Sequence, residues 1–380
     1  MIRNSTLTIG DGAFSGCSGF NGNLTLSYNM SKILDYVFDN CSGLTGDLYI
    51  PNSVISIGVK SFSNCNGFDG KLIIPNSIIS IGEGAFSHCS KLTGSLIIPN
   101  VCVSLREEAF FDCSNLNGTL SISENLTSIK ECTFKYCTKL RGDLIIPKSI
   151  KSIDMGAFQG CCSFTGSLYL SDNITSIEKY VFEGCCSFDG NLYLSKNIRI
   201  IKRYAFYKCF GFKGELTIPS EVVTIGERSF SKCFGFSNLK FESKNKIKSI
   251  GDYAFSGCSN FRGLLEIPSS IKIIGDSAFS NCSNFTSLYI PPNIKNIPHY
   301  AFYGCSGFKG NLEISSIIVI DEHAFHGCSG FTNKLNISSV RVIGDGAFIG
   351  CSGFTSLEFP ENISIIGNNI LTNYAPYGNI

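Results

Sequence analysis

Residues 50–72 read IPNSVISIGVKSFSNCNGFDGKL, and this stretch recurs with small changes along the chain. Its phenylalanine stands three residues before its cysteine, and the same pair returns at a nearly fixed spacing. Nine consecutive steps between these cysteines are 24 residues long, and the next five are 25, 24, 23, 23 and 23. A constant period in the twenties is typical of one short structural unit stacked many times. The cysteines of this series, called the ladder cysteines below, are Cys17, Cys41, Cys65, Cys89, Cys113, Cys137, Cys161, Cys185, Cys209, Cys233, Cys258, Cys282, Cys305, Cys328 and Cys351.

The apolar pattern within one unit predicts its local structure. Leu72 and Ile74 are two residues apart, which is the period of a strand, and this indicates a short strand whose two apolar side chains point to one side. The Val-x-x-Ile-Gly stretch, residues 54–58, predicts a second short extended segment. The spacing from Phe62 to Cys65 is helical but brief, so we expect a single 3₁₀ or α turn there.

A unit of this length cannot enclose its own Leu, Ile, Phe and Cys side chains. Stacked units can, because equivalent residues then lie about 4.8 Å apart, which is the strand spacing of a sheet. We therefore predict a repeat solenoid with about 15 coils of 23–25 residues, parallel strands on one face, turns on another and a continuous apolar core.

The unbroken period favours a single solenoid over residues 1–380, with 15 repeats centred on Cys17 to Cys351. Residues 352–380 are expected to form the last strand and a degenerate C-terminal cap, in which Leu371 and Tyr374 occupy the Phe and Cys positions. The main irregularity, residues 240–248, lies in the only 25-residue step and predicts a lengthened loop.

Composition excludes several classes of partner. The chain carries 31 basic and 30 acidic residues, a net charge of +1. It therefore has no overall positive potential that would attract the phosphates of nucleic acid, and nucleic acid is not an expected partner. No apolar run approaches the roughly 18 residues of a membrane helix. Residues 1–10 show no hydrophobic signal region, so we expect either no leader or the loss of a leader and first repeats.

The cysteines have three possible roles. Disulfides between stacked coils would need specific Cβ directions, whereas stacked equivalents point in parallel, so we expect the ladder cysteines to be small buried residues in a tight turn. Metal binding is not expected, because no Cys-x-x-Cys occurs and the four histidines are scattered. Cys162 and Cys186, which follow ladder cysteines directly and stack one repeat apart, are the candidates for an exposed bridge or reactive thiols.

No catalytic constellation stands out, and we predict no enzyme activity and no cofactor. His323 and His326 have His-x-x-His spacing beside Asp321 and Glu322, but a short turn carries them and solvated side chains are the simpler interpretation. The glycines recur in register with the repeat and indicate turns, not phosphate-binding loops. Repetition also presents one group many times, whereas catalysis needs different groups at one point.

The composite motif Ile-Pro-x-Ser-Val-x-x-Ile-Gly-x-x-Ala-Phe-x-x-Cys-x-x-Leu/Phe resembles the BspA-like class of leucine-rich repeats. Residues 75–92, PNSIISIGEGAFSHCSKL, are a close example, and the resemblance extends over about residues 1–371. It implies a curved solenoid of leucine-rich-repeat type, with the parallel β-sheet on the concave face and short strands and 3₁₀ or α turns on the other faces. It also implies a cell-surface or secreted protein that acts in adhesion to host or matrix proteins.

The residue between Leu and Ile in each predicted strand points away from the core. In the first two-thirds of the chain six strands hold Tyr or Ile at this position, and towards the C-terminus it holds three glutamates, Glu266, Glu313 and Glu358. Exposed strips of this composition often mark interaction sites, although the same residues are also good strand formers. The predicted partner-binding residues are Tyr49, Ile73, Ile97, Ile145, Tyr169 and Tyr193.

The sequence thus predicts a non-enzymatic protein-binding repeat protein, with adhesion at the cell surface as the leading function. An intracellular scaffold for protein–protein interaction is the alternative, because nineteen cysteines suit a reducing compartment and no leader or anchor is visible. A structural component that self-associates end to end is a third possibility. The identity of the protein partner cannot be read from repeat positions.

Overall fold

The structure is a computed structural model that describes residues 2 and 4–371. It is a parallel β-solenoid of about 14 turns of the leucine-rich-repeat type, which confirms the predicted fold class. Its internal contacts define two compact units, Met1–Ser195 and Lys196–Ile380, and each is described by itself. Every element assigned within the described residues is a strand of two to six residues. The predicted single domain stays a prediction, and Tyr374 of the predicted cap lies outside the described residues.

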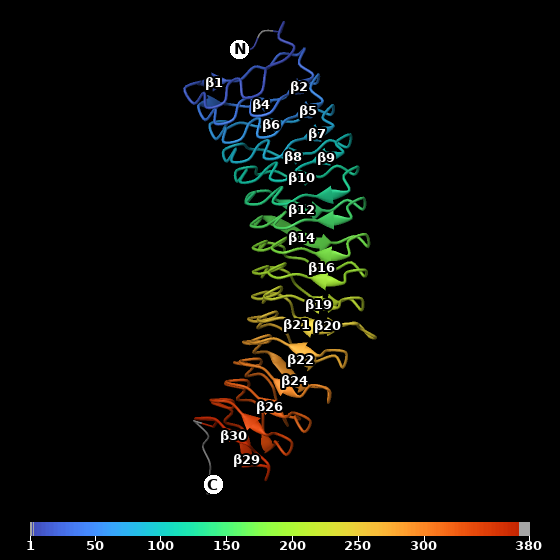
Figure 1. Cartoon of the computed structure of the whole chain (residues 1–380), viewed down its shortest axis with the longest axis vertical. Helices are drawn as coiled ribbons and strands as arrows, with labels where there is room; N and C mark the ends of the chain where they lie inside the picture. Colours follow the sequence, from blue (N-terminus) through green and yellow to red (C-terminus); the bar gives the residue numbers. More distant parts are fainter. Residues whose placement is uncertain (1, 3, 372–380) are drawn as a thin grey trace. The chain divides into compact units, whose positions relative to one another are not determined.

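The first set of strands comes mainly from the Leu-x-Ile stretches and the residues just before them. Strands of adjacent coils form parallel pairs, as between Leu48–Tyr49 and Leu72–Ile73 (Figure 1). Leucine points into the core and the following residue points out, as in the buried–exposed pattern of Leu48 and Tyr49. In the first unit these strands are β1 (Gly22–Asn23), β3 (Leu44–Thr45), β4 (Leu48–Tyr49), β6 (Leu72–Ile73), β8 (Leu96–Ile97), β10 (Leu120–Ser121), β12 (Gly142–Ile145), β14 (Phe164–Tyr169) and β16 (Leu192–Tyr193). In the second unit they are β18 (Glu215–Ile218), β20 (Asn238–Phe241), β22 (Gly263–Glu266), β24 (Phe285–Tyr289), β27 (Asn333–Asn336) and β29 (Phe354–Glu358).

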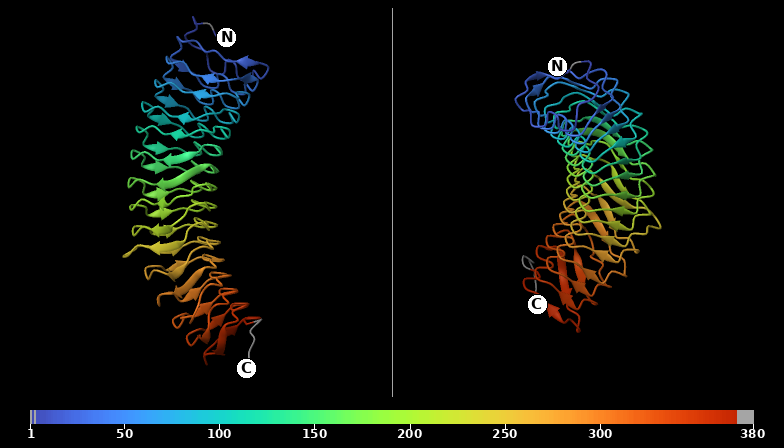
Figure 2. Two further views of the ribbon diagram at one scale, coloured as in Figure 1. Left: turned by 180° about the vertical axis from the view of Figure 1, so that it is seen from behind. Right: turned by 45° about the horizontal axis from the view of Figure 1, so that its top comes forward.

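The second set of strands confirms the extended segment predicted from Val-x-x-Ile-Gly. These strands have two residues each, and the second residue is usually a buried isoleucine. Figure 2 shows the coils of the two units from two further directions. In the first unit they are β2 (Lys32–Ile33), β5 (Ser56–Ile57), β7 (Ser80–Ile81), β9 (Ser104–Leu105), β11 (Ser128–Ile129), β13 (Ser152–Ile153) and β15 (Ser176–Ile177). In the second unit they are β17 (Ile200–Ile201), β19 (Thr224–Ile225), β21 (Ser249–Ile250), β23 (Ile273–Ile274), β25 (Asn296–Ile297), β26 (Val319–Ile320), β28 (Val342–Ile343) and β30 (Ile365–Ile366).

The segment that carries Phe and Cys is neither a 3₁₀ nor an α helix, which corrects the expected helical turn. Two residues per coil, at Phe−2 and Cys−1, have left-handed backbone conformations, such as Lys60 (φ 48°) and Asn64 (φ 57°). A left-handed residue cannot continue a right-handed helix, so the chain makes consecutive tight turns instead. The amides of Lys60, Phe62 and Asn64 donate at 2.8–2.9 Å to carbonyls of the next coil. This turn segment therefore forms a third row of hydrogen bonds between coils.

The core is built from aligned side chains of equivalent residues. Phe38, Phe62, Phe86 and Phe110 are fully buried, and neighbouring rings stack at 5.3–5.5 Å between centroids with interplanar angles of 2–12°. The second unit repeats this arrangement, with the rings of Phe302 and Phe325 at 5.4 Å. Burying each phenylalanine stabilises the fold by roughly 1.5–3 kcal/mol, which makes this aromatic row a main source of stability.

The ladder cysteines from Cys41 onward are buried, as the sequence predicts. Their thiols also have a role that the sequence did not reveal. The Sγ of Cys65 donates to the carbonyl of Phe38 at 2.9 Å, and Cys89 makes the same bond to Phe62 at 3.0 Å. Bonds of this kind recur in both units, up to Cys351 and Phe325 at 3.1 Å. The thiol is therefore a second donor to a carbonyl that already accepts from the cysteine amide of its own turn.

The irregular step in the second unit is a lengthened loop, as the sequence predicts. The loop covers residues 242–248 between β20 and β21. The amide of Ser220 donates to the carboxylate of Glu242 at 2.9 Å, and the amide of Lys246 donates to the carbonyl of Ser220 at the same distance. These bonds hold the longer loop against the preceding coil, so that the strand pairing continues on both sides of it.

Candidate functional site

The predicted partner-binding residues all lie in the first unit, at the outward position of the first set of strands. We call these six residues the apolar strip. Their exposed fractions range from 38% for Ile73 to 72% for Ile145, and Tyr169 is 60% exposed. The leucine beside each of them is buried. The strip is therefore formed by the alternation of the strands and is not a failure of core packing. Its residues are Tyr49 (β4), Ile73 (β6), Ile97 (β8), Ile145 (β12), Tyr169 (β14) and Tyr193 (β16).

Register brings five of the six residues of the strip together in two groups. Tyr49 pairs with Ile73 across β4 and β6, and Ile145 pairs with Tyr169 across β12 and β14. The rings of Tyr169 and Tyr193 stack at 4.5 Å between centroids with an interplanar angle of 8°. Such contact fixes both rings in one orientation, so a partner would meet a preformed aromatic surface.

The strip is hollowed at Ser121, which pairs with Ile97 and carries a small polar side chain where its neighbours carry large apolar ones. An open cavity of about 880 Å³ lies here, with Ser121 and Ile145 in its lining and Glu124, Asp143 and Lys148 around it. A second cavity of about 370 Å³ lies between Ile145 and Tyr169. Ile145 therefore stands between two hollows that could accept side chains of a partner.

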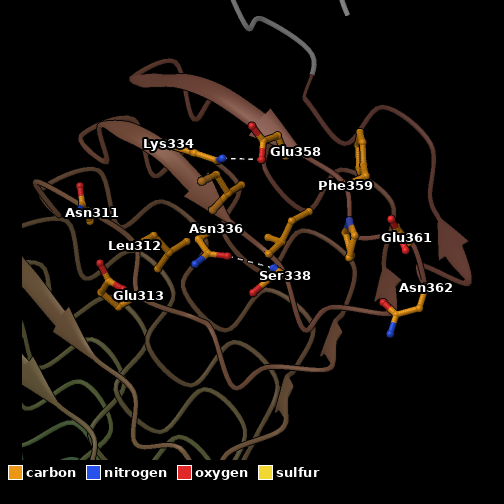
Figure 3. Close-up of a pocket in the computed structure, with 13 residues that line it drawn as sticks. Asn311, Leu312, Glu313, Lys334, Asn336, Ser338, Glu358, Phe359, Glu361 and Asn362 are labelled. Carbon is orange, nitrogen blue, oxygen red and sulfur yellow. Dashed lines mark hydrogen bonds and ion pairs between the residues drawn. The ribbon is translucent and has the colours of Figure 1, made fainter.

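In the second unit the outward position of the first set of strands becomes acidic. Figure 3 shows Glu313, Glu358 and Glu361 among the residues that line a cavity near the C-terminal coils. The volume of this cavity is about 780 Å³. Lys334 forms an ion pair with Glu358, with 2.5 Å between Nζ and Oε2. One cation thus faces three carboxylates, and the cavity is net negative. Glu266, the remaining predicted glutamate, is exposed at the end of β22.

The turn segments of the second unit carry an aromatic and cationic cluster that the sequence analysis missed. The guanidinium of Arg228 lies 4.3 Å from the ring centroid of Tyr253 and donates from Nη1 to the hydroxyl of Tyr204 at 2.7 Å. These three residues occupy the same place in successive repeats, two positions before each core phenylalanine. A comparison of this position across the repeats would have identified the three residues from the sequence.

His323 and His326 do approach each other, with 3.0 Å between their Nδ1 atoms. The ring of His323 packs against Tyr300, and its Nε2 lies 3.5 Å from the carboxylate of Glu322. Burial, and then the neighbouring His323, lowers the pKa of His326 below its usual range. The part of the chain that the structure describes holds no group of three or more His, Cys, Asp or Glu suited to a metal ion. Its described residues also include no helix long and apolar enough to cross a bilayer.

Fold and repeated surface together define a leucine-rich-repeat protein. The chain belongs to the BspA-type leucine-rich-repeat family: the family profile described as "BspA type Leucine rich repeat region (6 copies)" matches residues 1–117, 68–189, 117–233, 175–309 and 248–377. The predicted family is thereby confirmed. Proteins of this repeat family are typically non-enzymatic. No curated protein matches the chain.

Solved structures of bacterial leucine-rich-repeat proteins are similar to this chain. The crystal structure of a leucine-rich repeat protein from Bacteroides ovatus ATCC 8483 is 25% identical with a TM-score of 0.53, covering 95% of this chain and 78% of that chain. A leucine rich cell surface protein from Faecalibacterium prausnitzii A2-165 is 22% identical with a TM-score of 0.48, covering 83% of this chain and 87% of that chain. The first of these supports the solenoid fold.

Proposed function

We propose that this chain is a non-enzymatic protein-binding repeat protein whose apolar strip is the contact surface for a protein partner. One observation carries the proposal: six large apolar or aromatic side chains stand exposed in equivalent positions of one unit. Solvent exposure of this much aligned apolar surface is unfavourable unless a partner covers it. Tyrosine suits such a surface, because it supplies apolar area and a hydroxyl at a low cost in side-chain entropy.

The hollow at Ser121 gives the proposed contact its specificity. A partner that places a bulky apolar side chain there would pack against Ile145 and displace water from the cavity. Asp143 and Lys148 would then lie at the rim, where opposite charges of the partner could fix its orientation. Anchors of this type commonly carry most of the binding free energy of an interface.

We place the protein at the cell surface or in the secreted fraction, with adhesion to host or matrix proteins as its role. Support comes from its membership of the BspA-type family. The second candidate is an intracellular scaffold, which the nineteen cysteines favour because a reducing compartment keeps thiols free. Labelling intact cells with a membrane-impermeant reagent separates the two, since only a surface protein is labelled before lysis.

The binding surface is tested with two sets of three substitutions in the full chain. Tyr49→Ser, Tyr169→Ser and Tyr193→Ser together remove the aromatic part of the strip. The matched control replaces three tyrosines of similar exposure elsewhere in the first unit, Tyr28, Tyr36 and Tyr136, by serine. Binding to a panel of purified matrix proteins and to host-cell lysate proteins is measured by surface plasmon resonance and pulldown.

We expect the strip variant to lose at least tenfold in affinity for any partner, while the control variant binds like the natural chain. Ser121→Phe fills the hollow from an exposed position and is expected to weaken binding without lowering the melting temperature. A strip variant that binds every partner as tightly as the control would exclude this surface.

A further inference from the structure

The outward face of the first set of strands in the second unit carries an ordered pattern of charge. From β20 onward, the residue that follows the leucine of each coil is exposed. Register pairs Glu266 with Tyr289. It also pairs Asn336 with both Glu313 and Glu358. We call this row the charged column, and its members in chain order are Lys240, Glu266, Tyr289, Glu313, Asn336 and Glu358.

The two ends of the charged column have opposite charges, and both are open to solvent. The side chain of Lys240 is 60% exposed, and its ion pair with Glu215 is long, with 3.9 Å between Nζ and Oε1. The side chain of Glu358 is 74% exposed even though it forms an ion pair with Lys334. Side chains this exposed can each take a further partner of opposite charge. The two ends cannot meet within one copy, because the other members of the column lie between them.

Two copies that meet through this face in opposite directions bring both ends together at once. Lys240 of each copy then faces Glu358 of the other. No glutamate of the column faces another glutamate in this arrangement. Such a self-complementary contact, in which every pair occurs twice, is the isologous interface of a two-fold dimer. The pairs across the interface are Lys240 with Glu358, Glu266 with Asn336, and Tyr289 with Glu313.

The charge pattern also excludes the neighbouring registers. A slip of one coil in one direction places Glu266 opposite Glu313. A slip in the other direction places Glu266 opposite Glu358, and Glu313 opposite the same residue of the second copy. Like charges that face each other across an interface are strongly unfavourable. The column therefore specifies one register for two copies of this unit.

A cavity beside Lys240 gives the contact room for side chains. The lengthened loop opens it where the sheet of β18 and β20 ends and the sheet of β22 and β24 begins. Its volume is about 830 Å³, and its lining includes Lys240, Lys244, Arg262 and Leu264. Both Lys244 and Arg262 are exposed, and Leu264 is 46% exposed. Glu242, also in the lining, accepts a backbone amide of the preceding coil, so its charge is already bonded. The cavity thus combines cations with an apolar contact.

The segment after β29 has the matching composition. Glu358 is followed by Phe359, which is 42% exposed, and the exposed Glu361 comes two residues later. Figure 3 shows these three side chains on the chain that leaves β29. In the register above, the apolar ring and its two flanking carboxylates meet Leu264 and the cations of the cavity.

We propose that the chain forms a two-fold dimer in which the charged columns of two second units pack face to face in opposite directions. Charge complementarity selects a second copy as the occupant, because the cationic cavity and the acidic segment lie on one face of the same unit. The dimer surface is independent of the apolar strip, which lies in the first unit.

The test measures the mass of the full chain by analytical ultracentrifugation at about 1–100 μM, a range that covers micromolar dissociation constants. We expect a monomer–dimer equilibrium that weakens as salt is added, because exposed charges are screened. Glu358→Lys and Lys240→Glu should each raise the dissociation constant about tenfold or more, since each creates two like-charge contacts per dimer. The matched control is Lys272→Glu, which reverses an exposed charge beside β23, in the second set of strands, and should leave the dimer unchanged.

A mixture of the two variants tests the register directly. In a mixed dimer, the glutamate introduced at position 240 faces the lysine introduced at position 358. The unchanged Lys240 of one chain faces the unchanged Glu358 of the other. Both ion pairs are restored, so the mixture should dimerise more tightly than either variant alone. Circular dichroism shows that each variant has kept its fold.

A natural chain that stays monomeric at about 100 μM overturns the proposal. A mixture of the two variants that associates no better than its components also overturns it. A monomeric chain that binds a labelled peptide of residues 354–363 would overturn self-association as well, and would assign the cavity to an acidic segment of another protein.

Discussion

Raising the pH from 8 to 10 should destabilise the solenoid through its buried thiols. Burial raises the pKa of Cys89, Cys305 and Cys351 to about 12, from an ordinary value of 9.0. Between these values an unfolded chain has lost the thiol proton while the native chain keeps it. The native state thus binds more protons, so the stabilisation is complete below about pH 9 and is lost as the pH rises toward 12.

The magnitude follows from the size of the shift. One pKa unit corresponds to about 1.4 kcal/mol, so at pH 10 each of these thiols lowers the free energy of unfolding by about 1.4 kcal/mol. These three thiols alone account for a loss of roughly 4 kcal/mol, against a typical stability of about 5–15 kcal/mol. Burial also raises the pKa of other ladder thiols, including Cys137 and Cys258, so their effects add to this loss.

The assay is guanidinium unfolding at pH 8, 9 and 10, followed by circular dichroism, with thiolate absorbance recorded in parallel. Cys89→Ala is the matched control, because it removes one of the titrating thiols. At pH 8 it should be less stable by about 1–2 kcal/mol, since the carbonyl of Phe62 loses its thiol donor. Between pH 8 and 10 its loss of stability should be smaller than that of the natural chain by about 1.4 kcal/mol.

Two results would refute this reasoning. One is an unfolding free energy that stays constant between pH 8 and 10. The other is titration of the ladder thiols near pH 9 in a chain whose circular dichroism is unchanged, since ionised sulfur could not donate to the phenylalanine carbonyls.

Three further predictions concern other parts of the fold. Phe134→Ala should cost about 3–5 kcal/mol by calorimetry, since it breaks the aromatic row between Phe110 and Phe158, whereas Phe134→Leu should cost clearly less. Lys232→Gly should raise the free energy of unfolding by about 0.5–1 kcal/mol, because Lys232 is exposed at a φ of 64° that glycine adopts freely. The control Lys232→Val should lower the melting temperature, because valine is β-branched. The lowered pKa of His326 means that its contribution to stability is present above pH 6.5 and is lost as the pH falls. His326→Gln should remove this loss of stability in acid. A pKa of His326 at or above 6.5, measured by NMR titration, would contradict the prediction.

The period of the sequence was sufficient to predict the solenoid, because a short unit with four apolar positions can bury them only against copies of itself. The same pattern could not predict the conformation of the turns. Residues such as Tyr36, Glu108 and Tyr136 take left-handed conformations that their types disfavour. The row of hydrogen bonds to the next coil imposes these conformations, and a reading of local propensity does not include that row.

For the candidate site, alternation along the strands predicted which side chains would be exposed. The sequence could not predict the stacking of Tyr169 on Tyr193, because that contact depends on ring orientation as well as register. The sequence also could not predict the hollow at Ser121, because a small residue leaves a cavity only where its neighbours in space are large. The donor role of the ladder thiols was missed for a similar reason: their acceptor carbonyls lie about 27 residues earlier in the chain.

The strand pairing shows where the chain tolerates a change of length. Register shifts occur beside the first set of strands, between Asp143 and Ile145 and between Gly263 and Leu264. The second set and the turn segment keep their alignment through these coils. A gene encoding such a protein could therefore gain or lose whole repeats by unequal recombination. It could also gain or lose single codons beside the first set of strands, and the remaining coils would keep their structure.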